Sequence, residues 1–239
     1  MGTTYPYVVD ANTLALINFN EGTGTTAADD TDNDYDFTLS NEAAWSDTAK
    51  FGAHSLYPNA LYHASQGTLL DTVPAAGTVE FHFCPDVTFD SDSTAHEFLL
   101  YKRNLAVNCY AYILFYLRQD DGLMRVVMER DDCAFIVNMY SDQSSWTADQ
   151  WYHVALTWGA TGMKLYIDGL LNDSNAQTGR FEDGTNLDFG FGYSEAHGGP
   201  FNGKMDELRV SNVQRTDFTG PAPAAGGKMT PRTKWWGDI

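Results

Sequence analysis

Basic residues are scarce in this chain of 239 residues. It has 14 Lys and Arg against 32 Asp and Glu, which gives a formal net charge of −18 at pH 7. That charge repels a phosphate backbone or an anionic membrane surface unless basic residues gather on one face, and the body of the chain has no basic run. The composition therefore predicts no nucleic-acid partner and suits a soluble protein, or one that works in salt or with divalent cations.

Long apolar segments are also missing. No run approaches the roughly 20 apolar residues that a membrane helix needs, so we expect no membrane insertion. The N-terminal residues Met1–Asp10 contain neither a basic region nor an apolar stretch, so we expect no signal peptide in this chain. An extracellular or virion-surface location would then require release by lysis, another export route, or a mature fragment that carries a new Met.

Cysteine is rare and its number is odd. The chain contains Cys84, Cys109 and Cys133, with no C-x-x-C pair. This excludes a dense disulfide framework and a Cys-rich zinc site. The sequence does not exclude one disulfide bond between Cys109 and Cys133, although inert buried thiols are the interpretation we favour.

A sustained apolar stripe with a period of 3.6 residues is absent, whereas alternation with a period of two is frequent. The alternating runs are short, rich in β-branched and aromatic residues, and separated by Gly and Asp turns such as 119–122 (QDDG) and 168–169 (DG). They predict an antiparallel sandwich and argue against a parallel sheet with helical crossovers. The runs span residues 78–83, 110–117, 123–128, 134–139, 152–158 and 163–167.

Five segments follow one another in a distinctive order, and they carry a family resemblance. They are LALINF at 14–19, FGAHSL at 51–56, TVEFHF at 78–83, WYHVALTW at 151–158 and FNGKMDELRV at 201–210.

In order and spacing these segments resemble the laminin-G-like, concanavalin A-like jelly-roll domains, over roughly residues 10–215. The resemblance implies an all-β fold, a two-sheet antiparallel jelly-roll sandwich, which we assign to residues 1–216. Residues 217–239 read as a Pro/Ala/Gly linker and a basic-aromatic tail. Either that tail is a disordered end, or it is a docking peptide, because exposed adjacent tryptophans are costly in water.

Paired carboxylates, which glycoside-hydrolysing enzymes on this scaffold use, are not obvious in the sequence. A retaining pair needs its carboxyl groups about 5–5.5 Å apart. Asp206 and Glu207 are adjacent in an expected strand, so we expect their side chains on opposite faces. Glu129 and Asp131 alternate, but they lie at a strand end where a solvated turn is favoured. We therefore predict no enzymatic activity and expect His153 to be structural, with a polysaccharide-degrading enzyme as an alternative because the fold supports loose motifs.

The resemblance also implies a calcium ion at the rim of the sandwich, where the first strand ends beside the last strand and an acidic loop. Calcium takes about six to eight oxygen ligands from carboxylates and carbonyls, so acidic loops with Gly suit it. The other interpretation is a solvated acidic loop with one hydrogen-bonded aspartate. The candidate metal ligands are Glu21, Asp30, Asp32, Asn33 and Asp206.

Aromatic residues in the expected loops indicate a carbohydrate site. Aromatic faces stack on pyranose rings while Asp, Glu and Asn bind the hydroxyls, and long loops on a rigid sandwich usually carry function. Each aromatic could instead pack in the core or at the rim. The candidate ligand-binding residues are Tyr193, Trp146, Trp45, Tyr101, Glu195 and Asn104.

These patterns together favour a non-enzymatic recognition or adhesion module that binds carbohydrate or a glycosylated surface, assisted by Ca²⁺. Weak single sites would gain strength through many displayed copies. The main alternative is a structural particle-surface protein, such as a phage capsid decoration or tail adhesion protein, with a capsid or particle partner bound through Lys228–Ile239.

Overall fold

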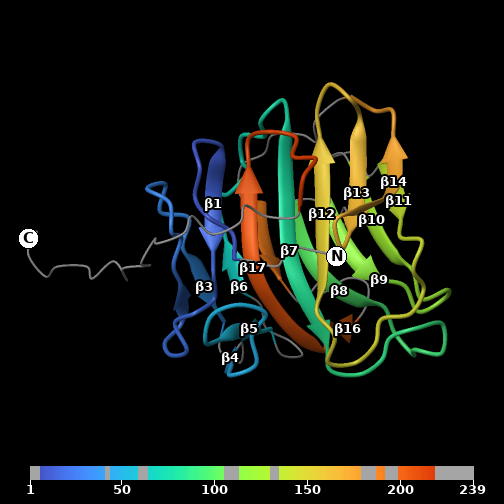
Figure 1. The fold of residues 1–239 in the computed structure, drawn as a ribbon, viewed down its shortest axis with the longest axis horizontal. Coiled ribbons are helices and arrows are strands. Elements are labelled where there is room, and N and C mark those ends of the chain that lie inside the picture. The colour runs from blue at the N-terminus through green and yellow to red at the C-terminus, as the bar shows by residue number, and fades with distance from the viewer. Residues whose placement is uncertain are drawn as a thin grey trace, which may run out of the picture.

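Every regular element in the described part of the chain is a β-strand, and the strands form two layers that face each other in Figure 1. The all-β, two-sheet antiparallel jelly-roll sandwich is therefore confirmed. The described part contains no helix that could cross a membrane. The computed structural model describes residues 6–40, 44–58, 64–104, 113–129, 135–178, 187–191 and 199–218.

The first layer, which we call the front sheet, lies nearer the viewer in Figure 1. Its described strands are β1 (Thr13–Ile17), β4 (Ala44–Ser46), β5 (Ser55–Tyr57), β7 (Gly77–Pro85), β12 (Tyr152–Trp158), β13 (Met163–Ile167), β14 (Leu170–Asn175) and β17 (Gly203–Ser211). They pair in the order β14-β13-β12-β7-β17-β5-β4, and β1 also pairs with β17. All of these pairings are antiparallel.

The second layer, which we call the rear sheet, lies behind the first (Figure 1). Its described strands are β2 (Thr26–Ala27), β3 (Phe37–Leu39), β6 (Ala64–Gln66), β8 (Glu97–Asn104), β9 (Ile113–Leu117), β10 (Met124–Glu129), β11 (Phe135–Tyr140), β15 (Leu187–Phe191) and β16 (Gly199–Pro200). They pair in the order β11-β10-β9-β8-β15-β6-β3-β2, and β16 adds a short parallel pairing to β8.

The apolar core lies between the sheets, because alternate residues of each strand point inward. In β7 the inward side chains are Val79, Phe81 and Phe83, which belong to the main core cluster. The Phe81 ring lies 5.4 Å from the ring of Phe115 and 5.7 Å from that of Phe191, both in the rear sheet. Thr78, Glu80, His82 and Cys84 of β7 therefore point to the outer face of the front sheet.

Both predicted hairpin turns are confirmed. Gly122, between β9 and β10, has φ 73°, and a Cβ atom there would lie 2.0 Å from the Ser144 carbonyl oxygen. Asp168 and Gly169, between β13 and β14, have φ 50° and 77°. Consecutive positive φ values are typical of a two-residue turn that matches the twist of the flanking strands.

A β-bulge in β17 changes the register around its two acids. His82 of β7 pairs with Asp206, whereas Glu80, two residues earlier, pairs with Arg209, three residues later. Glu207 lies in the bulge, where β17 has one more residue than β7, and has a φ angle of 53°. A bulge of this kind interrupts the alternation on which the expectation of opposite faces rested.

Both acids of the bulge face the outer side of the front sheet. Asp206 Oδ2 accepts a hydrogen bond from the Phe51 amide at 3.1 Å, and Glu207 Oε2 accepts one from the Tyr7 amide at 2.9 Å. The rings of Phe51 and Tyr7 both lie beside His82, with centroids 5.5 and 5.6 Å away. The expectation that the two side chains point to opposite faces is therefore wrong.

Segments near the two ends of the described chain cover this outer face. Tyr7 is 5% exposed, and its ring centroid lies 6.5 Å from that of His153. Phe218 is 2% exposed, and its ring lies 4.7 Å from Tyr166 and 5.3 Å from His153. Phe218 is the last residue that the structure describes, and residues 219–239 lie outside the described part, so the boundary expected at 216 stays a prediction.

Candidate functional site

The outer face of the front sheet holds a buried ion network with the residue types of an active site. Glu80 Oε1 accepts a hydrogen bond from Arg209 Nε at 2.8 Å, and Glu80 Oε2 lies 3.3 Å from His153 Nε2. Burial opposes ionisation of Glu80, but the hydrogen bond from His153 and the charge of Arg209 outweigh it, so its pKa lies below the usual value. The Glu80 and His153 side chains are 0% exposed. This placement fits a structural role, because a substrate cannot reach them.

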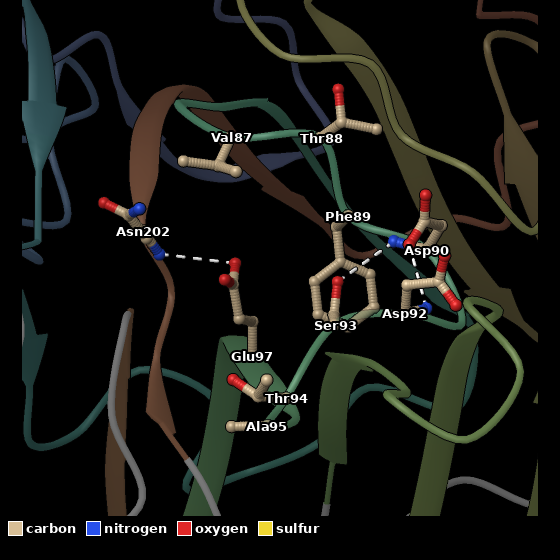
Figure 2. Close-up of a pocket in the computed structure, with 10 residues that line it drawn as sticks. All are labelled: Val87, Thr88, Phe89, Asp90, Asp92, Ser93, Thr94, Ala95, Glu97 and Asn202. Carbon is tan, nitrogen blue, oxygen red and sulfur yellow. Dashed lines mark hydrogen bonds between the residues drawn. The ribbon is translucent and has the colours of Figure 1, made fainter.

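A pocket that does reach the surface lies at the end of the sandwich where β7 terminates and β8 and β17 begin. Its volume is about 380 Å³. Carboxylates, hydroxyl groups and one amide line it together with the apolar side chains of Val87, Phe89 and Ala95, as Figure 2 shows. The lining residues are Val87, Thr88, Phe89, Asp90, Asp92, Ser93, Thr94, Ala95, Glu97 and Asn202.

Glu97, the first residue of β8, supplies the best-placed polar group of this pocket (Figure 2). Its Oε2 accepts a long hydrogen bond of 3.4 Å from the Asn202 amide. Burial raises the pKa of Glu97 to about 7, the Asn202 bond opposes this, and the charge of Asp86 adds to it. Of the residues that the structure describes, no basic side chain forms an ion pair with Glu97. Near neutral pH the carboxyl can therefore accept or donate a hydrogen bond to a neutral ligand.

The loop that forms most of the pocket wall is braced by its own side chains. Asp90 Oδ1 accepts a hydrogen bond from the Asp92 amide at 2.9 Å, and the Ser93 hydroxyl accepts one from the Asp90 amide at 3.1 Å. The backbone of Phe89 exchanges two hydrogen bonds with that of Trp146. Such local bonds hold the wall in one conformation, so a ligand would meet a preformed site.

The opposite rim is held by a tyrosine and an ion pair. The Tyr57 hydroxyl donates to Asn202 Oδ1 at 3.1 Å. Burial, together with a hydrogen bond to Asp86 and its charge, raises the pKa of Tyr57 to about 12, so this hydroxyl stays protonated. Lys204 pairs with Asp86 and lies 3.8 Å from Asp149. The nearby lysine is thus neutralised, and the pocket keeps an oxygen-rich lining.

Three predicted ligand-binding aromatics lie in the described part, and two of them are buried. Trp146 is 0% exposed, and its Nε1 donates to the Gly122 carbonyl at 2.8 Å. Tyr101 is 1% exposed. Rings without exposed surface cannot stack on a sugar, so the predicted contacts do not fit this structure. Trp45 is half-buried on edge strand β4, and its Nε1 donates to the Gly24 carbonyl at 3.0 Å.

The other three predicted ligand-binding residues cannot be compared with the structure. Tyr193 and Glu195 lie outside the described residues. Cys109 and Cys133, for which a disulfide bond was considered, also lie outside them. Asn104 ends β8, but its side chain is outside the described part. Their roles stay predictions.

The predicted calcium ligands do not converge on one centre. Asp206 Oδ2 is occupied by the amides of Lys50 and Phe51 on the covered outer face, and Asn33 Nδ2 donates to the Leu14 carbonyl at 2.9 Å. Glu21 Oε1 accepts from the Ala28 amide at 2.8 Å, Asp30 is bonded to Asn18, and Asp32 is exposed. Within the described ranges no group of three or more His, Cys, Asp or Glu could hold a metal ion. Calcium therefore stays an expectation from the resemblance alone.

Sequence reasoning missed the pocket because it searched for aromatics. Residues 86–97 read DVTFDSDSTAHE, which is dense in carboxylates and hydroxyls. This composition also suits a solvated turn, so it carries a weak signal. The long β7–β8 connection was the usable cue, because long loops on rigid scaffolds often carry function.

Comparison with known proteins identifies the family. The family model for the concanavalin A-like lectin/glucanases superfamily matches residues 59–217, so the chain belongs to this superfamily, as the resemblance predicted. Comparison with curated protein sequences finds no match.

Solved structures with the same fold include binding domains of larger proteins. Domain 4 of an extracellular arabinanase from Geobacillus stearothermophilus, in complex with arabinotriose, has TM-score 0.64 and 18% identity, with 86% of this chain and 95% of that chain covered. The botulinum neurotoxin serotype D binding domain has TM-score 0.60 and 13% identity, with 85% and 49% covered. The same toxin domain in complex with N-acetylneuraminic acid has TM-score 0.59 and 11% identity, with 85% and 48% covered. This chain therefore spans about half of the toxin domain, and the likeness is one of fold.

Proposed function

We propose that this protein is a non-enzymatic carbohydrate-recognition module that binds a neutral saccharide in the pocket at the end of the sandwich. The observation that carries the proposal is the lining of that pocket, in which Glu97 and Asn202 face a space of about 380 Å³. Two fold relatives, solved with arabinotriose and N-acetylneuraminic acid, support a saccharide as ligand class.

The lining suits a polyhydroxyl ligand without charge. Sugar hydroxyls both donate and accept, and the pocket offers carboxylate, hydroxyl and amide partners within one wall. An acidic sugar would meet the charges of Asp90, Asp92 and Glu97, which repel it. The exposed Val87, with 63% of its surface accessible, offers an apolar contact for the C–H face of a sugar ring.

The hydrogen bonding of the pocket carboxylates supports binding without catalysis. Hydrolysis of a glycosidic bond needs two carboxyl groups that face one another across the bond. Asp90 is bonded to the amide of Asp92 within its own loop, while Glu97 projects into the pocket. We therefore assign Glu97 to hydroxyl binding, and the alternative of a polysaccharide-degrading enzyme predicts release of reducing ends that this proposal does not.

Calorimetry with neutral oligosaccharides, chosen from a glycan array, tests the proposal. Glu97→Gln should weaken binding about tenfold or more, because hydrogen bonds to a charged acceptor are worth about 1.5–3 kcal/mol. Asp142→Asn is the matched control, since this exposed acid lies outside the pocket lining. The proposal fails if no neutral saccharide binds, or if Glu97→Gln binds as the wild type does.

The adhesive, particle-surface role remains the second hypothesis for the whole chain. It depends on the tail Lys228–Ile239, which lies outside the described residues. Deletion of these residues should abolish particle association and leave saccharide binding in the pocket unchanged. Retained association after the deletion would remove the tail as an anchor.

A further inference from the structure

The pocket at the end of the sandwich offers more hydrogen-bond acceptors than donors. The described residues that line it include Asp90, Asp92 and Glu97, and neither Lys nor Arg. Its side-chain donors are three hydroxyl groups and the amide of Asn202. An ionised carboxylate only accepts hydrogen bonds, whereas a hydroxyl group both donates and accepts. The lining therefore has acceptors and negative charge to spare.

The Glu97 carboxyl is the acceptor with the most unused capacity. In the part of the chain that the structure describes, its Oε2 has one hydrogen bond, of 3.4 Å from the Asn202 amide, and its Oε1 has none. A carboxylate has about four acceptor positions. Figure 2 shows this carboxyl projecting into the pocket. A ligand therefore finds both oxygens of Glu97 available.

Two further acids of the wall keep unused oxygen atoms. Asp90 accepts the Asp92 amide at 2.9 Å through Oδ1, which leaves its Oδ2 without a bond from any described residue. The Asp92 side chain is exposed, and no described residue donates to its carboxylate. These oxygens add acceptor capacity and negative charge to the wall that contains Glu97.

No protein cation balances Glu97 in the described part of the chain. The lysine of the opposite rim, Lys204, pairs with Asp86 and lies 3.8 Å from Asp149. Burial raises the pKa of Glu97 to about 7, the Asn202 bond opposes this change, and the charge of Asp86 adds to it. A carboxyl without a counter-charge keeps its proton to a higher pH, and a ligand cation beside it would favour the ionised form.

We propose that the saccharide unit that this pocket binds most tightly carries an ammonium group, as an amino sugar does. The inference rests on the proposed function, because it names the ligand class of the same pocket. An ammonium group has three N–H donors, no acceptor and one positive charge, so it complements the free oxygens of Glu97. A neutral unit also forms hydrogen bonds with the lining, but it leaves the negative charge unbalanced and binds more weakly.

Calorimetry at pH 7 with a matched pair of ligands, cellotriose and triglucosamine, tests the proposal. The two share one skeleton and differ at carbon 2 of each ring, which carries a hydroxyl group in the first and an amine in the second. The wild type should bind triglucosamine about tenfold or more tightly than cellotriose, because hydrogen bonds between charged groups are the stronger ones.

Variants of the wall locate the preference. Glu97→Gln weakens both ligands but should reduce the affinity ratio about tenfold, to near one, because glutamine is neutral. Asp92→Asn should reduce the ratio by about twofold or more, since this acid is exposed. Asp142→Asn is the control, because it removes one exposed acid from outside the lining and should keep the wild-type ratio.

Thermal unfolding checks the fold of each variant, and Asp92→Asn decides the question if Glu97→Gln does not fold. Equal binding of the two ligands by the wild type overturns the inference and leaves the proposed function standing. Binding of neither also overturns it, and the other neutral saccharides of the array then decide the proposed function separately. An unchanged ratio in the wall variants overturns it. An equal loss in Asp142→Asn does so too, because net charge would then explain the preference.

Discussion

The outer faces of the two sheets carry similar side chains, but these side chains are buried to different degrees. On the front sheet the guanidinium of Arg209 pairs with Glu80 and lies 4.3 Å from the Tyr7 ring centroid, and none of these side chains is more than slightly exposed. On the rear sheet Arg125 also contacts tyrosine rings, but it and Tyr140 stay half-buried. The same arginine–aromatic contact is thus buried under chain segments on the front sheet and partly exposed on the described part of the rear sheet.

The largest expected effect comes from the covered face. Glu80→Gln leaves Arg209 without its buried counter-charge, which should lower the free energy of unfolding by about 3–5 kcal/mol. Urea unfolding at neutral pH measures it. Asp10→Asn, which breaks the exposed ion pair in which Arg215 Nη2 donates to both Asp10 carboxylate oxygens, should cost only about 0–1 kcal/mol. Equal losses in the two variants would contradict the distinction between covered and uncovered ion pairs.

A medium effect is expected at Trp146, whose backbone pairs with that of the pocket-lining Phe89. Trp146→Phe removes the donor to the Gly122 carbonyl and leaves a gap in the core, which should lower the free energy of unfolding by about 1–3 kcal/mol. Trp45→Phe removes a similar bond to Gly24 at a half-exposed edge and should cost under about 1 kcal/mol. Chemical denaturation of both variants compares them. A larger loss in free energy of unfolding for Trp45→Phe than for Trp146→Phe would contradict this ranking.

Glu80 and Glu97 should respond to pH in opposite directions. The pKa of Glu97 is raised to about 7, so its contribution to stability is present below the ordinary value of 4.5 and is lost as the pH rises through 7. The pKa of Glu80 is lowered, so its contribution is present above 4.5 and is lost as the pH falls. Glu97→Gln should flatten the fall in stability between about pH 4.5 and 7 by about 1–2 kcal/mol, after allowance for partial exposure. Unfolding curves across this range measure it, and an unchanged slope would refute the assignment.

The smallest effect is expected at the exposed end of the rear sheet. Tyr140→Ala loses ring contacts with Arg118 and Arg125 that are partly in water, so the free energy of unfolding should fall by under about 1 kcal/mol. Thermal and urea unfolding measure this change. A loss as large as that of Glu80→Gln would show that this face is covered in solution.

Strand positions were predictable where alternation was strong and turns were clear. The runs expected at 152–158 and 163–167 coincide with β12 and β13, and those at 78–83 and 123–128 differ from β7 and β10 only at their ends. Both hairpin turns were predictable because positive φ favours Gly and Asp. The bulge in β17 was not predictable, because the sequence MDEL at 205–208 has the same pattern that a regular strand could have.

The candidate site was predicted poorly, for a physical reason. Trp146 and Tyr101 have the residue type of a sugar-stacking group, but distant segments pack over them. Nothing in the sequence around Glu97 distinguishes it from other acids. Its pKa is raised by burial in the pocket, which residues of the loop after β7 line. Burial depends on residues far apart in the chain, and residue type alone does not report it.

By itself the sequence determined the β-class, the antiparallel pairing through short turns, and membership of a recognisable superfamily, because alternation and turn chemistry act over a few residues. Only the tertiary structure decided which polar clusters are covered and which remain accessible. That choice depends on where segments such as the one carrying Tyr7 and the one ending at Phe218 lie, and their positions follow from packing of the whole chain.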